Sequence, residues 1–171
     1  GYIDPVVLAA RQPLTAIAKS EVAAWPIVGR MGAELGIMFV ERGSAHSGFR
    51  VLRRVLRALA AGATVLNFPE GTTSDGQDVL PFHRGIFGAA RIAGVPVVPV
   101  RLCFDDPSLV WVGDAPFVPH YLELASRRGA RVRLEVLAAL DPSAFARAED
   151  LAEAARGALR GRASERAPLA S

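Results

Sequence analysis

Residues 49–76 decide the fold, and they read FRVLRRVLRALAA, then GATVLNF, then PEGTTSDG. In the first part, valines and leucines recur at intervals of three and four residues with arginines between them, which predicts an amphipathic helix over residues 49–61. Gly62 ends that helix, and the apolar, partly β-branched residues 63–68 predict a strand. The polar, glycine-containing residues 69–79 then predict a loop. A helix that leads through one glycine into an apolar strand is typical of an α/β domain.

The same alternation of helical patterns and apolar runs continues on both sides of this stretch. Asp4 is expected at the N-cap of a helix, and Pro96 and Pro99 indicate that the strand containing them is irregular or lies at an edge. We therefore expect a single α/β domain over residues 1–159, with a central, mostly parallel or mixed sheet flanked by helices, and a frayed tail over residues 160–171. The remaining helices are expected at residues 5–11, 25–35, 85–93, 119–126 and 146–159, and the remaining strands at residues 15–20, 36–40, 95–104, 109–112 and 131–137.

Composition excludes several classes of protein. The chain has 171 residues, of which 51% are hydrophobic and 22% are charged, so intrinsic disorder is excluded and a sizeable core is expected. No uninterrupted run of about 18 apolar residues is present, which excludes a transmembrane helix within these residues. Cys103 is the only cysteine and the three histidines show no metal-ligand spacing, so we expect neither an internal disulfide nor a metal site.

The charge balance narrows the set of partners. A formal net charge of +3 permits contact with an anionic membrane surface, a phosphorylated substrate or an acidic carrier protein. It is too small to indicate nucleic-acid binding, and no arginine-rich stretch is interleaved with aromatic residues. The arginine face of the helix over residues 49–61 is either a docking surface for such an anionic partner or a solvated surface.

The loop after the strand at residues 63–68 is the first candidate site. Ligands in open α/β sheets bind at the carboxyl ends of strands, and glycines there let the backbone approach a ligand and expose N–H groups to an anion. An ordinary polar turn has a similar composition, and the residue pattern leaves both interpretations open. The loop residues that can contact a ligand are Glu70, Gly71, Thr72, Thr73 and Ser74.

Arg42 is the second candidate. The strand expected over residues 36–40 places Arg42 at its carboxyl end, where the guanidinium can pair with a phosphate. A surface arginine that follows a core strand is the alternative explanation.

Four blocks of residues stand in a fixed order along the chain. They are Asp4-Pro5 with the apolar run after it, the set Gly36, Phe39 and Arg42, the run FPEGTTS at residues 68–74, and the apolar strand around Pro96 and Pro99. In this order they resemble the glycerolipid acyltransferases typified by 1-acylglycerol-3-phosphate acyltransferase, and the resemblance covers residues 1–101 most closely. The third block has Thr73 where that family has arginine, and in this form it resembles the branch that acylates lyso-ornithine lipids.

The family's first block is His-x-x-x-x-Asp, and Asp4 matches its aspartate. The histidine would lie two positions before Gly1, and the chain begins without methionine and without a signal-peptide pattern. We therefore expect that the N-terminal part of the acyltransferase domain precedes Gly1 and that residues 1–171 alone are inactive.

The resemblance implies a function. It implies a bacterial O-acyltransferase that moves a fatty acyl group from a thioester donor, acyl-CoA or acyl carrier protein, to the hydroxyl of a lysophospholipid such as 1-acylglycerol-3-phosphate, in phospholipid biosynthesis. It implies no metal or redox cofactor, and a place at the cytoplasmic face of the membrane, peripheral or anchored by residues before Gly1. Lyso-ornithine lipid as the acceptor is one alternative, and a non-catalytic lipid- or carrier-binding module of the same fold is another.

The resemblance also assigns roles to individual residues. The upstream histidine takes the proton of the acceptor hydroxyl, and Asp4 orients that histidine, as in a serine protease triad with the substrate in place of the serine. Arg42 clamps the phosphate or carboxylate of the acceptor, and Glu70 orients the acceptor hydroxyl or anchors its loop. Backbone N–H groups of the loop stabilise the oxyanion. The acceptor site is lined by Gly71, Thr72, Thr73 and Ser74.

Overall fold

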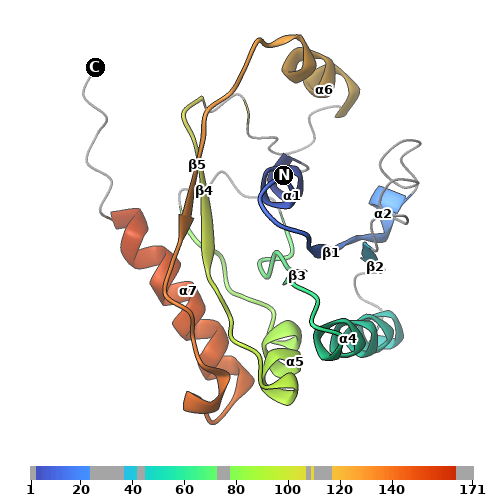
Figure 1. The fold of residues 1–171 in the computed structure, drawn as a ribbon, viewed down its shortest axis with the longest axis vertical. Coiled ribbons are helices and arrows are strands. Elements are labelled where there is room, and N and C mark those ends of the chain that lie inside the picture. The colour runs from blue at the N-terminus through green and yellow to red at the C-terminus, as the bar shows by residue number, and fades with distance from the viewer. Residues whose placement is uncertain are drawn as a thin grey trace.

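The computed structural model describes residues 3–23, 37–41, 45–72, 78–106, 109 and 117–164. These residues form two sheets with helices beside them (Figure 1). One sheet is parallel, with β1 (Thr15–Lys19) between β2 (Met38–Val40) and β3 (Val65–Leu66). The other is antiparallel and pairs β4 (Val100–Phe104) with β5 (Val132–Val136). The predicted α/β fold with a parallel or mixed sheet flanked by helices is confirmed.

The helix α4 (Ala45–Ala60) packs its apolar stripe against the parallel sheet, next to β2 and β3. Val51 and Val55 are buried there, in one cluster with Met38 of β2 and Ala89. The arginines of α4 are exposed on the opposite face, so the predicted amphipathic helix is confirmed. The helix starts four residues earlier than predicted. The prediction missed residues 45–48 because they carry too few apolar side chains to contribute to the periodicity.

The helix α5 (Gly85–Ala93) has the predicted bounds and joins two apolar clusters. Ala89 belongs to the cluster under the parallel sheet, whereas Phe87 packs on Leu151 of α7 (Ala148–Ser164). Gly94 ends α5 with a φ of 63°, in the left-handed region that glycine adopts without strain. Because α5 contributes to both clusters, it ties the parallel sheet to α7, which lies along β4 and β5 (Figure 1).

The chain after α5 is irregular, as the two prolines predicted. Val97 and Leu140 exchange both backbone hydrogen bonds, at 3.0 and 2.8 Å, but regular pairing begins only at Val100. Pro96 and Pro99 have no N–H to donate to a neighbouring strand, which explains the interrupted pairing.

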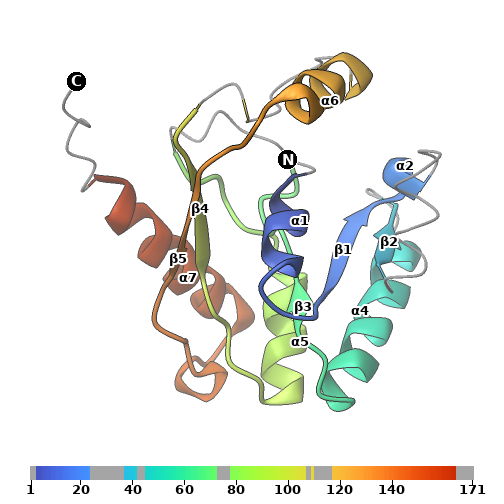
Figure 2. The same cartoon turned by 45° about the horizontal axis from the view of Figure 1, so that its top comes forward.

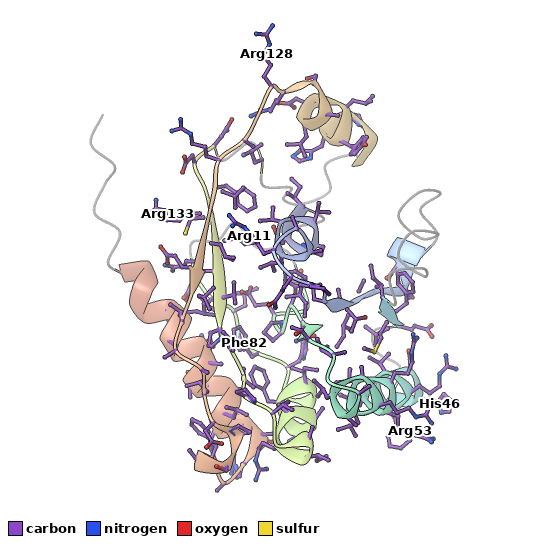
Figure 3. The ribbon with its side chains drawn as sticks, in the orientation of Figure 1. Arg11, His46, Arg53, Phe82, Arg128 and Arg133 are labelled. Atoms are coloured by element: carbon purple, nitrogen blue, oxygen red, sulfur yellow. The ribbon has the colours of Figure 1, made fainter. Side chains whose placement is uncertain are left out.

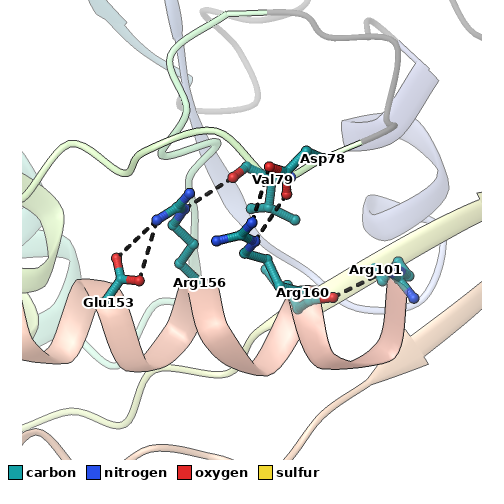
Figure 4. A network of polar contacts seen from close by, with 7 residues as sticks. Asp78, Val79, Arg101, Glu153, Arg156 and Arg160 are labelled. Carbon is teal, nitrogen blue, oxygen red and sulfur yellow. Dashed lines mark hydrogen bonds and ion pairs between the residues drawn. The ribbon is translucent and has the colours of Figure 1, made fainter. Parts of the chain in front are cut away.

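The C-terminal helix α7 is longer than predicted. It continues through residues 160–164, where we expected a frayed tail. Arg101 Nη2 donates to the carbonyl of Leu159 at 3.1 Å, and Arg160 Nε pairs with Asp78 Oδ1 at 3.0 Å (Figure 4). Arg156 Nε also donates to the carbonyl of Val79 at 3.0 Å. These partners lie far away in the sequence, so no local pattern indicates that the helix continues. Residues 165–171 lie outside the described residues.

The N-terminal helix α1 (Ile3–Ala9) corrects one prediction. Because α1 begins at Ile3, Asp4 lies in its first turn and is not the N-cap. An acidic residue in the first turn still interacts favourably with the helix dipole. After β1, Ser20 begins a short helix, α2 (Ser20–Ala23), so the strand ends one residue earlier than predicted.

The remaining predictions have mixed outcomes. The helix expected over residues 119–126 is α6 (Phe117–Ser126), and a single-turn helix (Pro142–Ala144) precedes α7. Leu109 is not in a strand, because its N–H donates to the carbonyl of Asp106 at 3.1 Å and so forms a turn. The helix predicted at 25–35 and the rest of the strand predicted at 109–112 lie outside the described residues.

Candidate functional site

The elements that carry the first and third blocks meet at one end of the parallel sheet. Since β1, β2 and β3 are parallel, their carboxyl ends lie at the same edge. The chain reverses between α1 and β1, which places the N-terminal end of α1, with Asp4, at that edge too (Figure 2). Glu70 follows the carboxyl end of β3, and Glu41 follows that of β2. This edge is where open α/β sheets bind ligands.

The third block begins with a tight turn. The N–H of Gly71 donates to the carbonyl of Phe68 at 3.1 Å, so Pro69 and Glu70 are the two central residues. Among the described residues only glycines have a positive φ, which fits a type I turn with proline in its favoured position. The carbonyl of Pro69 accepts from the N–H of His83 at 2.8 Å. The turn is therefore tied to the segment that leads into α5.

The turn places its side chains in different environments. Glu70 is half-buried and its Oε2 is shielded from solvent, so this oxygen faces the protein. Gly71 is half-buried, whereas Thr72 is exposed. The Thr72 side chain can thus contact a ligand from solvent, and a shielded carboxylate oxygen is compatible with either predicted role of Glu70, orienting the acceptor or anchoring the loop.

Three predicted site residues, Arg42, Thr73 and Ser74, lie outside the described residues. The backbone immediately before Arg42 is described, and the N–H of Glu41 donates to Ser47 Oγ at 3.0 Å. This bond links the carboxyl end of β2 to the first turn of α4. The roles of Arg42, Thr73 and Ser74 remain predictions.

The backbone conformation of Gly71 disfavours any residue other than glycine at this position of the turn. Its φ of 69° lies in the left-handed region, so we expect Gly71→Ala to lower the free energy of unfolding by about 1–2 kcal/mol. The matched control is Gly157→Ala in α7, where an added Cβ meets nothing within 4 Å, and this change should stabilise by about 0.5–1 kcal/mol. Urea denaturation of both variants tests the pair, and equal stability of Gly71→Ala and the parent would contradict the prediction.

A separate cavity of about 530 Å³ lies between the segment before α5 and the first turns of α7. His83 and Arg84 line one side, and Glu149 and Glu153 line the other. Arg84 pairs with Glu149 and holds the pKa of that carboxyl below its usual value, with a smaller contribution from Arg147. None of the predicted site residues lines this cavity. Sequence reasoning missed it because its two walls are far apart along the chain and carry no shared motif.

A family model described as acyltransferase matches residues 1–103, which include all four blocks. The chain belongs to the acyltransferase family. The expectation based on the order of the blocks is therefore confirmed. Among the helices in the part of the chain that the structure describes, none is both long enough and apolar enough to cross a membrane.

Two names occur among the curated relatives of this chain. The lyso-ornithine lipid O-acyltransferase of Pseudomonas aeruginosa is 33% identical over 164 residues, which is 93% of this chain and 63% of that protein. The 1-acyl-sn-glycerol-3-phosphate acyltransferase of Neisseria gonorrhoeae is 36% identical over 105 residues, or 61% of this chain and 41% of that protein. This chain thus spans less than two thirds of the length of either relative.

A solved structure shares the fold. The 1-acyl-sn-glycerophosphate acyltransferase PlsC from Thermotoga maritima aligns over 98% of this chain and 63% of its own, with a TM-score of 0.66. At 24% sequence identity, this similarity establishes the fold alone.

Proposed function

We propose that the protein transfers a fatty acyl group from a thioester donor to the hydroxyl of a lyso-lipid. The match of the family model to residues 1–103 carries this proposal, since those residues hold all four blocks. The position of Asp4 and Glu70 on elements that meet at the carboxyl edge of the parallel sheet supports it, because one active site needs both at the same end.

The proposed chemistry needs a base. A lipid hydroxyl is a poor nucleophile near neutral pH, so its proton must be taken as its oxygen attacks the thioester carbonyl. We assign this step to a histidine five positions before Asp4, with Asp4 holding the ring in the tautomer whose other nitrogen accepts the proton. The tetrahedral intermediate then loses the thiolate, which takes the same proton from the imidazolium, so no acyl-enzyme forms.

The oxyanion of that intermediate needs hydrogen-bond donors. We assign this role to backbone N–H groups that follow the turn at Pro69 and Glu70, because the N–H of Gly71 itself donates to Phe68. Gly71 has a positive φ, a conformation that suits a loop whose N–H groups bind an anion. Loss of one such donor typically costs a factor of about 100 to 1,000 in rate. Thr72, exposed next to the turn, is positioned to contact the acceptor, and Arg42 would pair with an acidic group of its headgroup.

The acceptor must come from a membrane, and we place the carboxyl edge of the sheet against the cytoplasmic face of that membrane. Exposed apolar side chains support this orientation: Val6 of α1 is 65% exposed, and Leu122 of α6 is 60% exposed. Figures 1 and 2 place α6 beyond the N-terminal end of α1, on the side of the candidate site.

Lyso-ornithine lipid is the second candidate acceptor, and two observations favour it over 1-acylglycerol-3-phosphate. Thr73 stands where the family has arginine, which removes a cation that would pair with a phosphate. The relative named for lyso-ornithine lipid also matches 93% of the chain, against 61% for the relative from Neisseria gonorrhoeae. An acceptor that carries a carboxylate and an amine instead of a phosphate suits a site with fewer arginines.

A direct assay of the full-length protein tests both the acyl transfer and the choice of acceptor. We expect kcat/KM for lyso-ornithine lipid to exceed that for lysophosphatidate by about tenfold or more, the effect of one charged hydrogen bond. Thr73→Arg should shift the preference toward lysophosphatidate, and Thr64→Arg, an exposed threonine just before β3, should not. Preference for lysophosphatidate in the parent would reject the second candidate. Lack of transfer to either acceptor would reject the proposed function and favour a non-catalytic binding module.

A further inference from the structure

The outer face of α4 concentrates positive charge. Among residues 45–60 there are four arginines and no acidic residue, although the whole chain has a net charge of only +3. All four arginines are exposed. We call this set the α4 arginine stripe: Arg50, Arg53, Arg54 and Arg57.

The stripe is not neutralised by the described part of the protein. Each member has two others three or four residues away, the spacing at which like charges on a helix repel. None of them forms an ion pair with any described residue, whereas on α7 Arg156 pairs with Glu153 and Arg160 with Asp78. No described acidic residue offsets this repulsion, and an acidic partner bound to the stripe would offset it.

An exposed aromatic ring lies at one end of the stripe. Phe49 is 60% exposed, and the guanidinium carbon of Arg53 lies 6.0 Å from the centre of its ring. Figure 3 shows Arg53 and His46 projecting outward from α4. A row of guanidiniums next to an exposed ring combines charge attraction with apolar contact, which is typical of a protein interface.

The direction of α4 distinguishes between two anionic partners. The apolar stripe of α4, with Val51 and Val55, is buried, so the outward face cannot turn. The helix starts near the carboxyl end of β2 and runs away from the candidate site along the flank of the sheet (Figure 2). Arg50 and Arg57 lie about 10 Å apart along that direction. A flat membrane at the candidate site would meet only the start of the stripe, whereas a protein on the flank would contact all of it.

We propose that the α4 arginine stripe docks an acidic helix of the acyl carrier protein that delivers the thioester. This proposal rests on the proposed function, because it names the donor of the same reaction. Docking on the flank next to the carboxyl edge leaves the edge open for the lyso-lipid, and the carrier's thioester arm reaches the site from the side.

Charge reversal on the stripe tests the proposal in the full-length protein. We expect R53E/R57E to raise KM for a palmitoyl-loaded acyl carrier protein at least tenfold while kcat stays within a factor of two, and to leave KM for palmitoyl-CoA unchanged. The matched control is R128E/R133E, which reverses two exposed arginines elsewhere on the surface (Figure 3). It should change neither KM.

Binding gives a second measurement that does not require turnover. Fluorescence anisotropy with labelled holo-carrier should show weaker binding by R53E/R57E and by the milder R53Q/R57Q, and added salt should weaken binding to the parent most. Equal carrier affinity in the parent and the variants would overturn the proposal. It would also be overturned if the variants kept their affinity for the carrier and lost binding only to anionic vesicles. Use of palmitoyl-CoA but not of the carrier would overturn it and leave the proposed function standing, whereas no transfer from either donor would reject the proposed function itself.

Discussion

Replacement of Asp4 by asparagine in the full-length protein is expected to lower kcat for acyl transfer by about 1,000- to 10,000-fold. An aspartate that orients a catalytic imidazole keeps it in the tautomer that can accept a proton, and the amide of asparagine imposes the wrong tautomer. The side chain stays almost the same size, so loss of activity reports on the carboxylate's effect on the imidazole and not on packing. KM for the acceptor should change little, because Asp4 acts on the base and does not contact the lipid.

The control for Asp4 is another aspartate that lies in the first turn of a helix. Asp4 lies in the first turn of α1 and Asp150 in the first turn of α7, so both carboxylates interact with a helix dipole. Asp150→Asn should retain full activity, and both variants should lose less than about 1 kcal/mol of stability in thermal unfolding. Activity of Asp4→Asn within tenfold of the parent would contradict the assignment.

Residues 1–171 assayed alone are expected to show no acyl transfer, whereas the full-length protein should be active. The base assigned to the reaction lies five positions before Asp4 and so outside this stretch. General base catalysis contributes a factor of about 100 to 10,000, and the acceptor hydroxyl has no other assigned base. Turnover is measured with the same donor and acceptor for both proteins.

The full-length protein with alanine in place of that histidine separates loss of the base from loss of other upstream contacts. It should be as inactive as residues 1–171, and it should still bind acyl carrier protein and unfold at the same temperature as the parent. Turnover by residues 1–171 at the rate of the full-length protein would show that the base lies within the chain and would remove the assigned mechanism.

Local signals along the chain predicted much of the fold. The bounds of α5 follow from an apolar pattern that ends at Gly94. The pattern and the glycine are local signals, because each determines the backbone within a few residues. The amphipathic pattern of α4 likewise indicated which face is buried, since Val51 and Val55 recur on one side of the helix. The irregular strand after α5 followed from Pro96 and Pro99, because a missing N–H is a property of the residue itself.

The candidate site was predictable in part. The order of the four blocks indicated the family and named Asp4, Glu70 and Gly71, and the family match confirms that order. The turn at Glu70 follows from proline before it and glycine after it, but the shielding of Glu70 Oε2 depends on neighbours that the loop's own sequence does not contain.

The sequence alone determined the class of fold, the amphipathic helix α4 and the family. The first two depend on the pattern of neighbouring residues, and the family depends on short motifs in a fixed order along the chain. Only the tertiary structure decided that α1 and β3 bring Asp4 and Glu70 to the same end of the sheet, and that α7 continues to Ser164. Strand order and the contacts of Arg101 and Asp78 with α7 join segments that are far apart in the sequence. Such contacts exist only when the chain has folded, so no local pattern encodes them.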